Sequence, residues 1–308
     1  MENVIAIIVT YNRKQLLEEC LEAVLKQTVP VYKIILIDNA STDGTEMLFK
    51  KGERYDLPQI EYHKMSENLG GSGGFYEGIK LCREDTYSWA WIMDDDTIPN
   101  VDCLEKLLKA KDKIDGKIGF LASYIKGPND EAMNVPTLDM TPSKNGYPFW
   151  YKYLNEKCVQ VAAATFVSVL VNQEAVLKCG LPCKDYFIWG DDAEYTQRIS
   201  THYAPCYFIG DSVAVHKRYN AKKLDIMLET DSKRLQMFQY YFRNMTINMG
   251  VFYGKVKMRK LIVHNFKLSI KMLLKRDPIR AKVIFMGTVK AVKEYGVFEN
   301  YINGQISE

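Results

Sequence analysis

The feature that most constrains the fold of this chain is the alternation of short apolar runs with amphipathic segments along its first hundred residues. Residues 4–10 are almost entirely apolar, which is typical of a strand buried on both faces of a sheet. Residues 16–25 then place apolar side chains at helical spacing, and residues 33–38, 61–64 and 89–93 are further candidate strands. This order predicts an α/β fold with an open, mostly parallel sheet and helices on both faces.

Polar clusters follow the expected strands at the points where the strands end. These clusters are residues 10–13, 38–39, 68–74 and 94–96. Ligands of open α/β sheets bind at the carboxyl ends of the strands. The coincidence therefore indicates a nucleotide-binding site at this edge of the sheet.

The length and composition limit the class of protein. With 308 residues, the chain can form one large domain or one domain with an appendage, and its 47% hydrophobic and 26% charged residues are typical of a globular protein. No apolar run approaches the roughly 18 residues of a membrane-spanning helix, and the N-terminus lacks a signal-peptide pattern, so we expect a cytoplasmic protein. Seven scattered cysteines predict reduced, buried thiols rather than a zinc site.

The charge of the chain is unevenly distributed. From residue 217 onward there are 19 Lys and Arg against 7 Asp and Glu, whereas the earlier residues carry 22 against 31. Apolar residues recur at helical spacing from about Asp225, and Asp277 with Pro278 predicts the start of a last helix. We therefore expect an α/β domain over residues 1–220 and a basic helical region over residues 221–308.

Three roles stay open for this basic region. It could pack on the α/β domain with a solvated basic face, contact an anionic membrane surface peripherally, or form a homo-oligomer interface. Nucleic acid is not an expected partner, because no recognition motif accompanies the charge.

The middle of the chain shows less regular patterns. Residues 123–159 are rich in Pro, Asn and Lys and lack periodicity, which predicts a long loop crossing an active face. Residues 161–171 form one further buried run. The segment from Ile188 to Glu194 is expected to open a helix with acidic residues at its positive end.

The acidic triplet Asp94-Asp95-Asp96 directly follows a candidate strand. It could be a capping turn before Pro99, or a Mg²⁺ or Mn²⁺ site, because adjacent carboxylates repel one another and these ions prefer oxygen ligands. In an extended segment, Asp94 and Asp96 lie on the same side and can converge.

A second acidic cluster contains Asp191, Asp192 and Glu194. Carboxylates at a helix start are usually caps, but one of them could serve as a general base. His216 ends the apolar run before it, and is either a structural histidine or a metal ligand beside the aspartates. The glycine-rich residues 68–75 allow close backbone approach to a ligand, although they are not the dinucleotide fingerprint, which follows the first strand.

Five segments together resemble the family-2 inverting glycosyltransferases, whose fold is of the GT-A type. They are Ile8–Arg13, Ile37–Thr45, Asn68–Phe75, Asp94–Asp96 and Trp189–Glu194. The glycine-rich segment, the all-aspartate triplet and the later histidine are most similar to galactofuranosyltransferases, because rhamnosyltransferases of this family more often have glutamine within the triplet. Tyr240 to Asn244 also resembles a segment of related transferases, for which the sequence offers no mechanism.

The resemblance implies a role for each matching residue. Asp192 would be the catalytic base, and Asp191 would contact a sugar. Independently of the resemblance, Trp150 or Trp189 could offer a sugar-stacking face or belong to the core. A Mn²⁺ or Mg²⁺ ion would be held by Asp94, Asp96 and His216. The pocket for the nucleotide, diphosphate and donor sugar would be formed by Thr10, Asn12, Arg13, Asp38, Asn39, Asn68, Gly71, Ser72, Gly73, Asp94 and Asp95.

The implied activity is metal-dependent, inverting transfer of galactofuranose from UDP-galactofuranose to a glycan or lipid-linked saccharide in surface polysaccharide synthesis. The alternatives are a rhamnosyltransferase using dTDP-rhamnose and a non-catalytic sugar-nucleotide-binding protein. Galactofuran-polymerising members carry a tryptophan pair where this chain has residues 162–166, Ala-Ala-Ala-Thr-Phe, so the acceptor is not implied.

Overall fold

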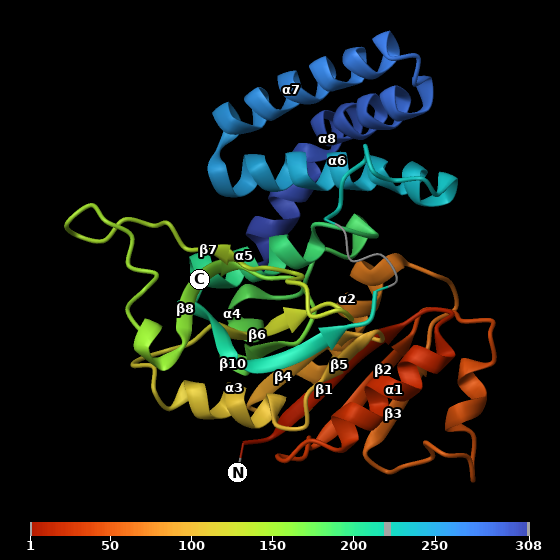
Figure 1. The fold of residues 1–308 in the computed structure, drawn as a ribbon, viewed down its shortest axis with the longest axis vertical. Coiled ribbons are helices and arrows are strands. Elements are labelled where there is room, and N and C mark those ends of the chain that lie inside the picture. Colours follow the sequence, from red (N-terminus) through yellow and green to blue (C-terminus); the bar gives the residue numbers. More distant parts are fainter. Residues whose placement is uncertain (1, 219–222, 307–308) are drawn as a thin grey trace.

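A single sheet organises most of the protein. The computed structural model describes residues 2–218 and 223–306, and within them ten strands pair in the order β3-β2-β1-β4-β9-β6-β10-β8-β7, with β5 alongside β10 (Figure 1). The strands are β1 Val4–Thr10, β2 Lys33–Asp38, β3 Ile60–Lys64, β4 Trp89–Asp94, β5 Thr97–Pro99, β6 Phe120–Lys126, β7 Thr137–Leu138, β8 Cys158–Ala163, β9 Val169–Asn172 and β10 Cys206–His216.

The expected mostly parallel sheet is confirmed. Strand β1 pairs in parallel with β2 and β4, β2 with β3, and β6 with β10, each over five or six residue pairs. The antiparallel pairings of β5, β7, β8 and β9 each span four residue pairs or fewer. Strand β1 thus lies between β2 and β4, its two parallel partners.

Both faces of β1 are buried, as the apolar run predicts. Its alternate residues Val4, Ala6 and Ile8 enter one core cluster with α1 and α3, whereas Ile5, Ile7 and Val9 enter another with α2, α4 and α5. The covering helices are α1 Lys14–Leu25, α2 Gly70–Arg83, α3 Cys103–Lys111, α4 Gln173–Cys179 and α5 Asp191–His202, with short 3₁₀ turns η1 Thr45–Phe49, η2 Leu154–Glu156 and η3 Lys184–Tyr186.

Three C-terminal helices, α6 Ser232–Tyr253, α7 Lys255–Leu274 and α8 Pro278–Gln305, pack together away from the sheet (Figure 1). The Asp277 side chain accepts the Arg280 N–H at 3.0 Å, which confirms the expected helix start. The far end of α8 returns to the sheet domain, where Tyr301 donates to the Pro182 carbonyl at 3.0 Å. The boundary expected between residues 220 and 221 lies outside the described residues.

None of the helices formed by the described residues has both the length and the apolar character of a membrane-spanning helix.

Two expectations for the middle of the chain hold only in part. The expected loop over residues 123–159 is confirmed for residues 127–136 and 139–153, but it also contains most of β6, all of β7 and the first residues of β8. The run expected over residues 161–171 is buried at most of its positions, but it is divided between β8 and β9, which occupy separate places in the sheet. These strands pair with partners far away in sequence, so a local pattern could not show where each begins or ends.

Candidate active site

The polar strand ends meet at one edge of the sheet. Thr10 lies in register with Asp38 on β2, and Val9 with Asp94 on β4. The chain runs from β1 to β2 and β3 on one side and then crosses to β4 on the other, so β1 and β4 flank a topological switch point. Open α/β sheets bind ligands at this position.

The middle aspartate of the triplet is turned into the protein. Thr10 donates its hydroxyl hydrogen to Asp95 at 2.7 Å, and Arg13 Nη1 lies 3.1 Å from Asp95 and 2.7 Å from Asp96. Burial raises the pKa of Asp95 to about 6, against the opposing charge of Arg13. Asp95 therefore anchors the triplet to the end of β1.

The other two aspartates form a group with His216 that could hold a metal ion. One ligand atom from each residue lies within 4.8 Å of the others. His216 Nε2 is 3.0 Å from Asp96 Oδ1, yet this buried oxygen accepts no hydrogen bond within the described part of the chain. Neighbouring ligands of an octahedral ion with bonds of about 2.1 Å lie roughly 3 Å apart. The pair His216 Nε2 and Asp96 Oδ1 has this spacing. Carboxylates are ligands that suit Mn²⁺ and Mg²⁺, and an imidazole can complete such a set.

A neighbouring loop residue orients the histidine. Asn134 Oδ1 lies 2.8 Å from His216 Nδ1 and can accept its hydrogen. In the neutral ring this places the lone pair on Nε2, which faces Asp96. Metal-binding histidines are usually oriented by such a hydrogen bond, and the sequence analysis did not identify Asn134.

Two residues expected in the nucleotide pocket, Asn12 and Asp38, form hydrogen bonds to neighbouring segments. Asn12 accepts the Thr42 N–H at 2.7 Å, and Asp38 accepts the Ser41 N–H at 2.7 Å and the Tyr62 hydroxyl at 2.5 Å. Asn12 thus joins the loop after β1 to the loop after β2. Asp38 fixes the loop that follows its own strand and also contacts β3.

The glycine-rich segment is shaped mainly by packing. Asn39 receives the Leu69 N–H at 3.0 Å and donates to the Gly70 carbonyl at 2.7 Å, and Asn68 accepts the Gly70 N–H at 2.8 Å. Gly70 has φ +73°, and a Cβ there would lie 1.9 Å from the Phe187 carbonyl oxygen. The remaining expected pocket residues differ in exposure: Ser72 and Gly73 are buried, whereas a Cβ on Gly71 would meet open space.

The second acidic cluster begins helix α5. Asp191 is 6% exposed, and Asp192 is partly exposed and accepts the Ala193 N–H at 2.6 Å. Burial raises the pKa of Asp192 to about 6, and burial with the Asp192 charge raises the pKa of Asp191 to about 7. A carboxylate with a pKa near neutrality can take up a proton during a reaction.

The charge of Asp191, at the start of α5, acts on the acidic triplet. Burial is the main cause that holds the pKa of Asp94 well above its usual range, and the charges that add to it include Asp96, Asp95 and Asp191. Glu194 is not available to this site, because it is fully buried in an ion pair with Arg198 at 2.8 Å. Asp191 and Asp192 are therefore the carboxylates of α5 that can act there.

Two further residues border the site. The Trp189 ring is partly buried, 5.0 Å from the Phe238 ring and 5.2 Å from the Arg234 guanidinium, so it joins the α5 entry to α6. Arg218, which the sequence analysis did not identify, is partly buried and lies near the charges of Asp96 and Arg13. Its pKa is lowered, mainly by burial.

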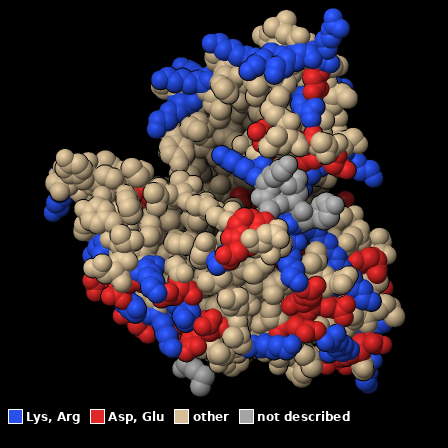
Figure 2. Space-filling model, viewed as in Figure 1, with Lys and Arg blue, Asp and Glu red and all other residues tan. Residues whose placement is uncertain are grey.

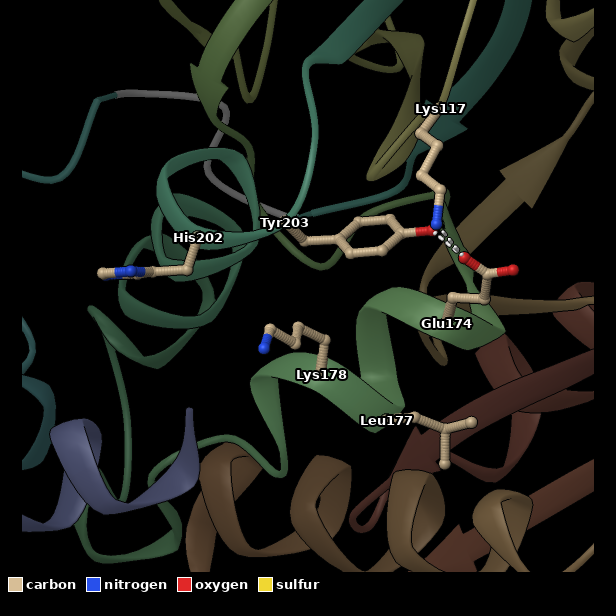
Figure 3. A pocket seen from close by; sticks show the side chains of 6 residues that line it. All are labelled: Lys117, Glu174, Leu177, Lys178, His202 and Tyr203. Carbon is tan, nitrogen blue, oxygen red and sulfur yellow. Dashed lines mark hydrogen bonds and ion pairs between the residues drawn. The ribbon is translucent and has the colours of Figure 1, made fainter. Parts of the chain in front are cut away.

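Residues 162–166 form no exposed aromatic platform, and a surface pocket lies away from Asp191 and Asp192. Phe166 is buried between Phe75 on α2 and Tyr195 on α5, in place of an exposed aromatic platform. The pocket in Figure 3 lies at the opposite end of α5, about 18 Å away at 1.5 Å per residue. Its lining residues are Lys117, Glu174, Leu177, Lys178, His202 and Tyr203.

The fold is similar to solved structures of sugar transferases. The structure of GalNAc-T7 with UDP, GalNAc and Mn²⁺ has a TM-score of 0.62 at 15% identity, over 98% of this chain and 57% of the other. The structure of Staphylococcus aureus TarS residues 1–349 with UDP-GlcNAc has a TM-score of 0.59 at 13% identity, over 98% and 88%. The expected GT-A-type architecture is confirmed.

Sequence relatives and a family match agree with the fold. An abequosyltransferase of Salmonella typhimurium is 40% identical over 28% of this chain and 26% of its own length, and a galactofuranosyltransferase of Mycolicibacterium smegmatis is 33% identical over 32% and 31%. The Mycobacterium tuberculosis galactofuranosyltransferase is 24% identical over 64% of each chain. These matches thus span from about a quarter to two thirds of each relative. Glycosyl transferase family 2 matches residues 5–177, more than half of the chain, and the protein belongs to this family.

Proposed function

We propose that the protein is an inverting, metal-dependent glycosyltransferase that uses a nucleotide-diphospho-sugar, with Asp192 as its catalytic base. The observation that carries this proposal is the presence of two unlike acidic groups, one at the end of β4 and one at the start of α5, where the charge of Asp191 acts on Asp94. Asp94 and Asp96 converge with an imidazole, as metal ligands do, whereas Asp192 is a partly exposed carboxylate of raised pKa. A protein that only bound sugar nucleotides would have no use for the second group.

The site residues would act in two groups, one on the acceptor hydroxyl and one on the leaving diphosphate. The acceptor hydroxyl attacks the anomeric carbon while Asp192 takes its proton, and the bond to the nucleotide diphosphate breaks on the opposite face, so that one displacement inverts the centre. An ion bound by Asp94, Asp96 and His216 would neutralise charge on the leaving diphosphate. Arg13, which is bound to Asp95 and Asp96, and Arg218, which is near the charges of Asp96 and Arg13, would add positive charge on that side, and Asp191 would contact a sugar.

The donor we favour is UDP-galactofuranose, and dTDP-rhamnose is the alternative. Galactofuranosyltransferases of two mycobacterial species are among the relatives, and the middle residue of the triplet is an aspartate here. This aspartate, Asp95, is bound by Thr10 and Arg13. The acceptor would be a glycan or a lipid-linked saccharide used in surface polysaccharide synthesis.

The C-terminal helices support a peripheral membrane contact on the cytoplasmic side. Helix α7 contains no Asp or Glu, and its exposed Val256, Val263, Ile270 and Leu274 recur at intervals of seven or four residues. Exposed Lys and Arg flank this stripe, and Figure 2 shows them along the upper edge of the molecule, over α7. Apolar residues between cations suit an anionic lipid surface. We propose that residues 221–308 serve this contact and residues 1–220 catalysis.

The donor assignment is tested by a panel of nucleotide sugars, with nucleotide release as the measurement. We expect turnover with UDP-galactofuranose, its loss in EDTA and its recovery with Mn²⁺, because the diphosphate needs a counter-charge as it leaves. Turnover with dTDP-rhamnose alone would contradict the donor, and full turnover in EDTA would contradict the metal.

The metal assignment is tested by binding of Mn²⁺ in the presence of UDP, followed by electron paramagnetic resonance. Asp96→Ala should abolish this binding, and Asn134→Ala should weaken it by about 10–100-fold because His216 loses its orienting partner. Asn129→Ala, in the same loop but exposed, is the matched control. Wild-type affinity in Asp96→Ala would refute the assignment.

The base assignment is tested by Asp192→Asn and by the pH dependence of turnover. The variant should bind UDP normally and lose about 10²–10⁴-fold in turnover. Because the base must be ionised, wild-type turnover should fall as the pH drops through about 6, the pKa of Asp192, and this dependence should be absent from the residual activity of the variant. Asp185→Asn, an exposed aspartate on the same segment, should behave like the wild type. Near-normal turnover in Asp192→Asn would move the role to Asp191.

The membrane contact is tested by co-sedimentation with vesicles of phosphatidylcholine containing phosphatidylglycerol. Binding should weaken with salt, and exchange of Lys267 and Lys271 for Glu should weaken it by at least about 1 kcal/mol per residue. Lys109→Glu, on α3, is the control. Binding that ignores salt and lipid charge would exclude this contact.

A further inference from the structure

The segment that leads into α5 has a strained backbone. Phe187, Trp189 and Gly190 have φ of 65°, 61° and 98°, in a region that side-chain-bearing residues rarely adopt. Each such conformation at a bulky residue costs on the order of 1–3 kcal/mol and persists only where the surroundings impose it. The segment 185–190 directly precedes Asp191 and Asp192, so its conformation sets the direction in which α5 begins.

Helix α6 supplies most of the groups that impose this conformation. Arg243 Nη2 donates to the Asp185 carbonyl at 2.7 Å, and Asn248 Nδ2 donates to the Gly190 carbonyl at 2.8 Å. Between them, the Nδ2 group of Asn244 lies within hydrogen-bond distance of three carbonyls. Its distances are 3.0 Å to Tyr186, 3.1 Å to Ile188 and 2.8 Å to Trp189.

The one carbonyl that α6 does not reach is bound from the other side. The Ser72 N–H, in the first turn of α2, donates to the Phe187 carbonyl at 3.2 Å. Every carbonyl from residue 185 to residue 190 therefore accepts a hydrogen bond from outside the segment. The glycine-rich segment and α6 therefore both bind residues 185–190 through hydrogen bonds.

The three α6 side chains are themselves fixed. Asn244 is fully buried, and its oxygen accepts from Arg243 Nε at 2.9 Å. The Asn248 oxygen accepts the Tyr186 hydroxyl at 2.7 Å, and the Arg243 guanidinium lies 5.3 Å from the centre of the Phe298 ring. These contacts determine which atom of each amide faces the loop carbonyls.

We propose that Arg243, Asn244 and Asn248 are positioning residues that set the direction of Asp192 through the backbone of residues 185–190. This inference rests on the proposed role of Asp192 as the base. The proposal assigns a role to Arg243 and Asn244, the last two residues of the Tyr240–Asn244 segment. The three side chains act on the backbone that carries the base, and a small displacement of a catalytic group can reduce the rate about 10²-fold.

The test uses single Asn→Asp exchanges, which keep the shape and the acceptor oxygen and remove the hydrogen-bond donor. Asn244→Asp can still accept from Arg243, and Asn248→Asp from Tyr186, while both present an oxygen to the loop carbonyls. Asn265→Asp makes the same change at a buried asparagine of α7, whose Nδ2 lies 3.3 Å from Thr246 Oγ1, away from the loop. All three variants bury a new carboxyl group, so Asn265→Asp controls for general destabilisation.

We expect Asn244→Asp and Asn248→Asp to lower kcat at least about 100-fold, with Mn²⁺ and UDP affinities within threefold of the wild type. Hydrogen exchange of residues 185–190 should accelerate in these variants and stay unchanged in Asn265→Asp.

Three results would overturn the proposal. They are a kcat no lower than that of Asn265→Asp, a parallel loss of UDP affinity, and unchanged exchange at residues 185–190 in Asn244→Asp. Absence of turnover in the wild-type protein would instead refute the proposed function. The exchange measurement does not need activity, so it still tests whether α6 restrains the loop.

Discussion

Repulsion among buried carboxylates is the constraint on which the site depends. Asp94, Asp95 and Asp96 repel one another at the end of β4, Asp191 at the start of α5 adds to the charge on Asp94, and Asp192 adds to the charge on Asp191. Burial removes much of the water that would screen these charges. Arg13 compensates Asp95 and Asp96, and the first amides of α5 compensate Asp192. The negative charge of Asp94 is compensated least by other groups of the protein, so a bound cation would stabilise this carboxylate most.

This balance explains why adjacent aspartates have different tasks. Asp95 is bound by Thr10 and Arg13, which leaves Asp94 and Asp96 to converge on His216. Arg13 contacts both kinds of aspartate, so it can respond to a change at the ion site. A diphosphate entering there would compete with Asp96 for the Arg13 guanidinium, and an ion that neutralised Asp96 would make that exchange easier.

The sequence predicted those parts of the site that follow from strand order and failed where contacts are long-range. Residues at the ends of β1, β2 and β4 could be placed together because parallel strands end at one edge, and Asp94, Asp96 and His216 do converge. By contrast, Asn134 lies in a loop without periodicity, and its contact with His216 spans 82 residues. Asp38 and Asn12 could be placed at the site, but not their hydrogen bonds to neighbouring loops. The division of residues 161–171 between β8 and β9 depends on partners that no local window contains.

The hydrogen bonds from α6 to residues 185–190 also limit how α6, α7 and α8 can move. Phe238 and Phe242 of α6 share a core cluster with residues of α7 and α8, so displacement of the bundle would act on the same helix that binds the loop. Because five successive or near-successive carbonyls are held by three side chains, α6 cannot shift substantially without leaving buried carbonyls unpaired, which costs about 1–3 kcal/mol each. The basic α7 is thus connected through α6 to residues 185–190, which precede Asp192, the proposed base. A lipid surface that holds α7 would fix the orientation of Asp192 relative to that surface, and hence the side from which a lipid-linked hydroxyl reaches it.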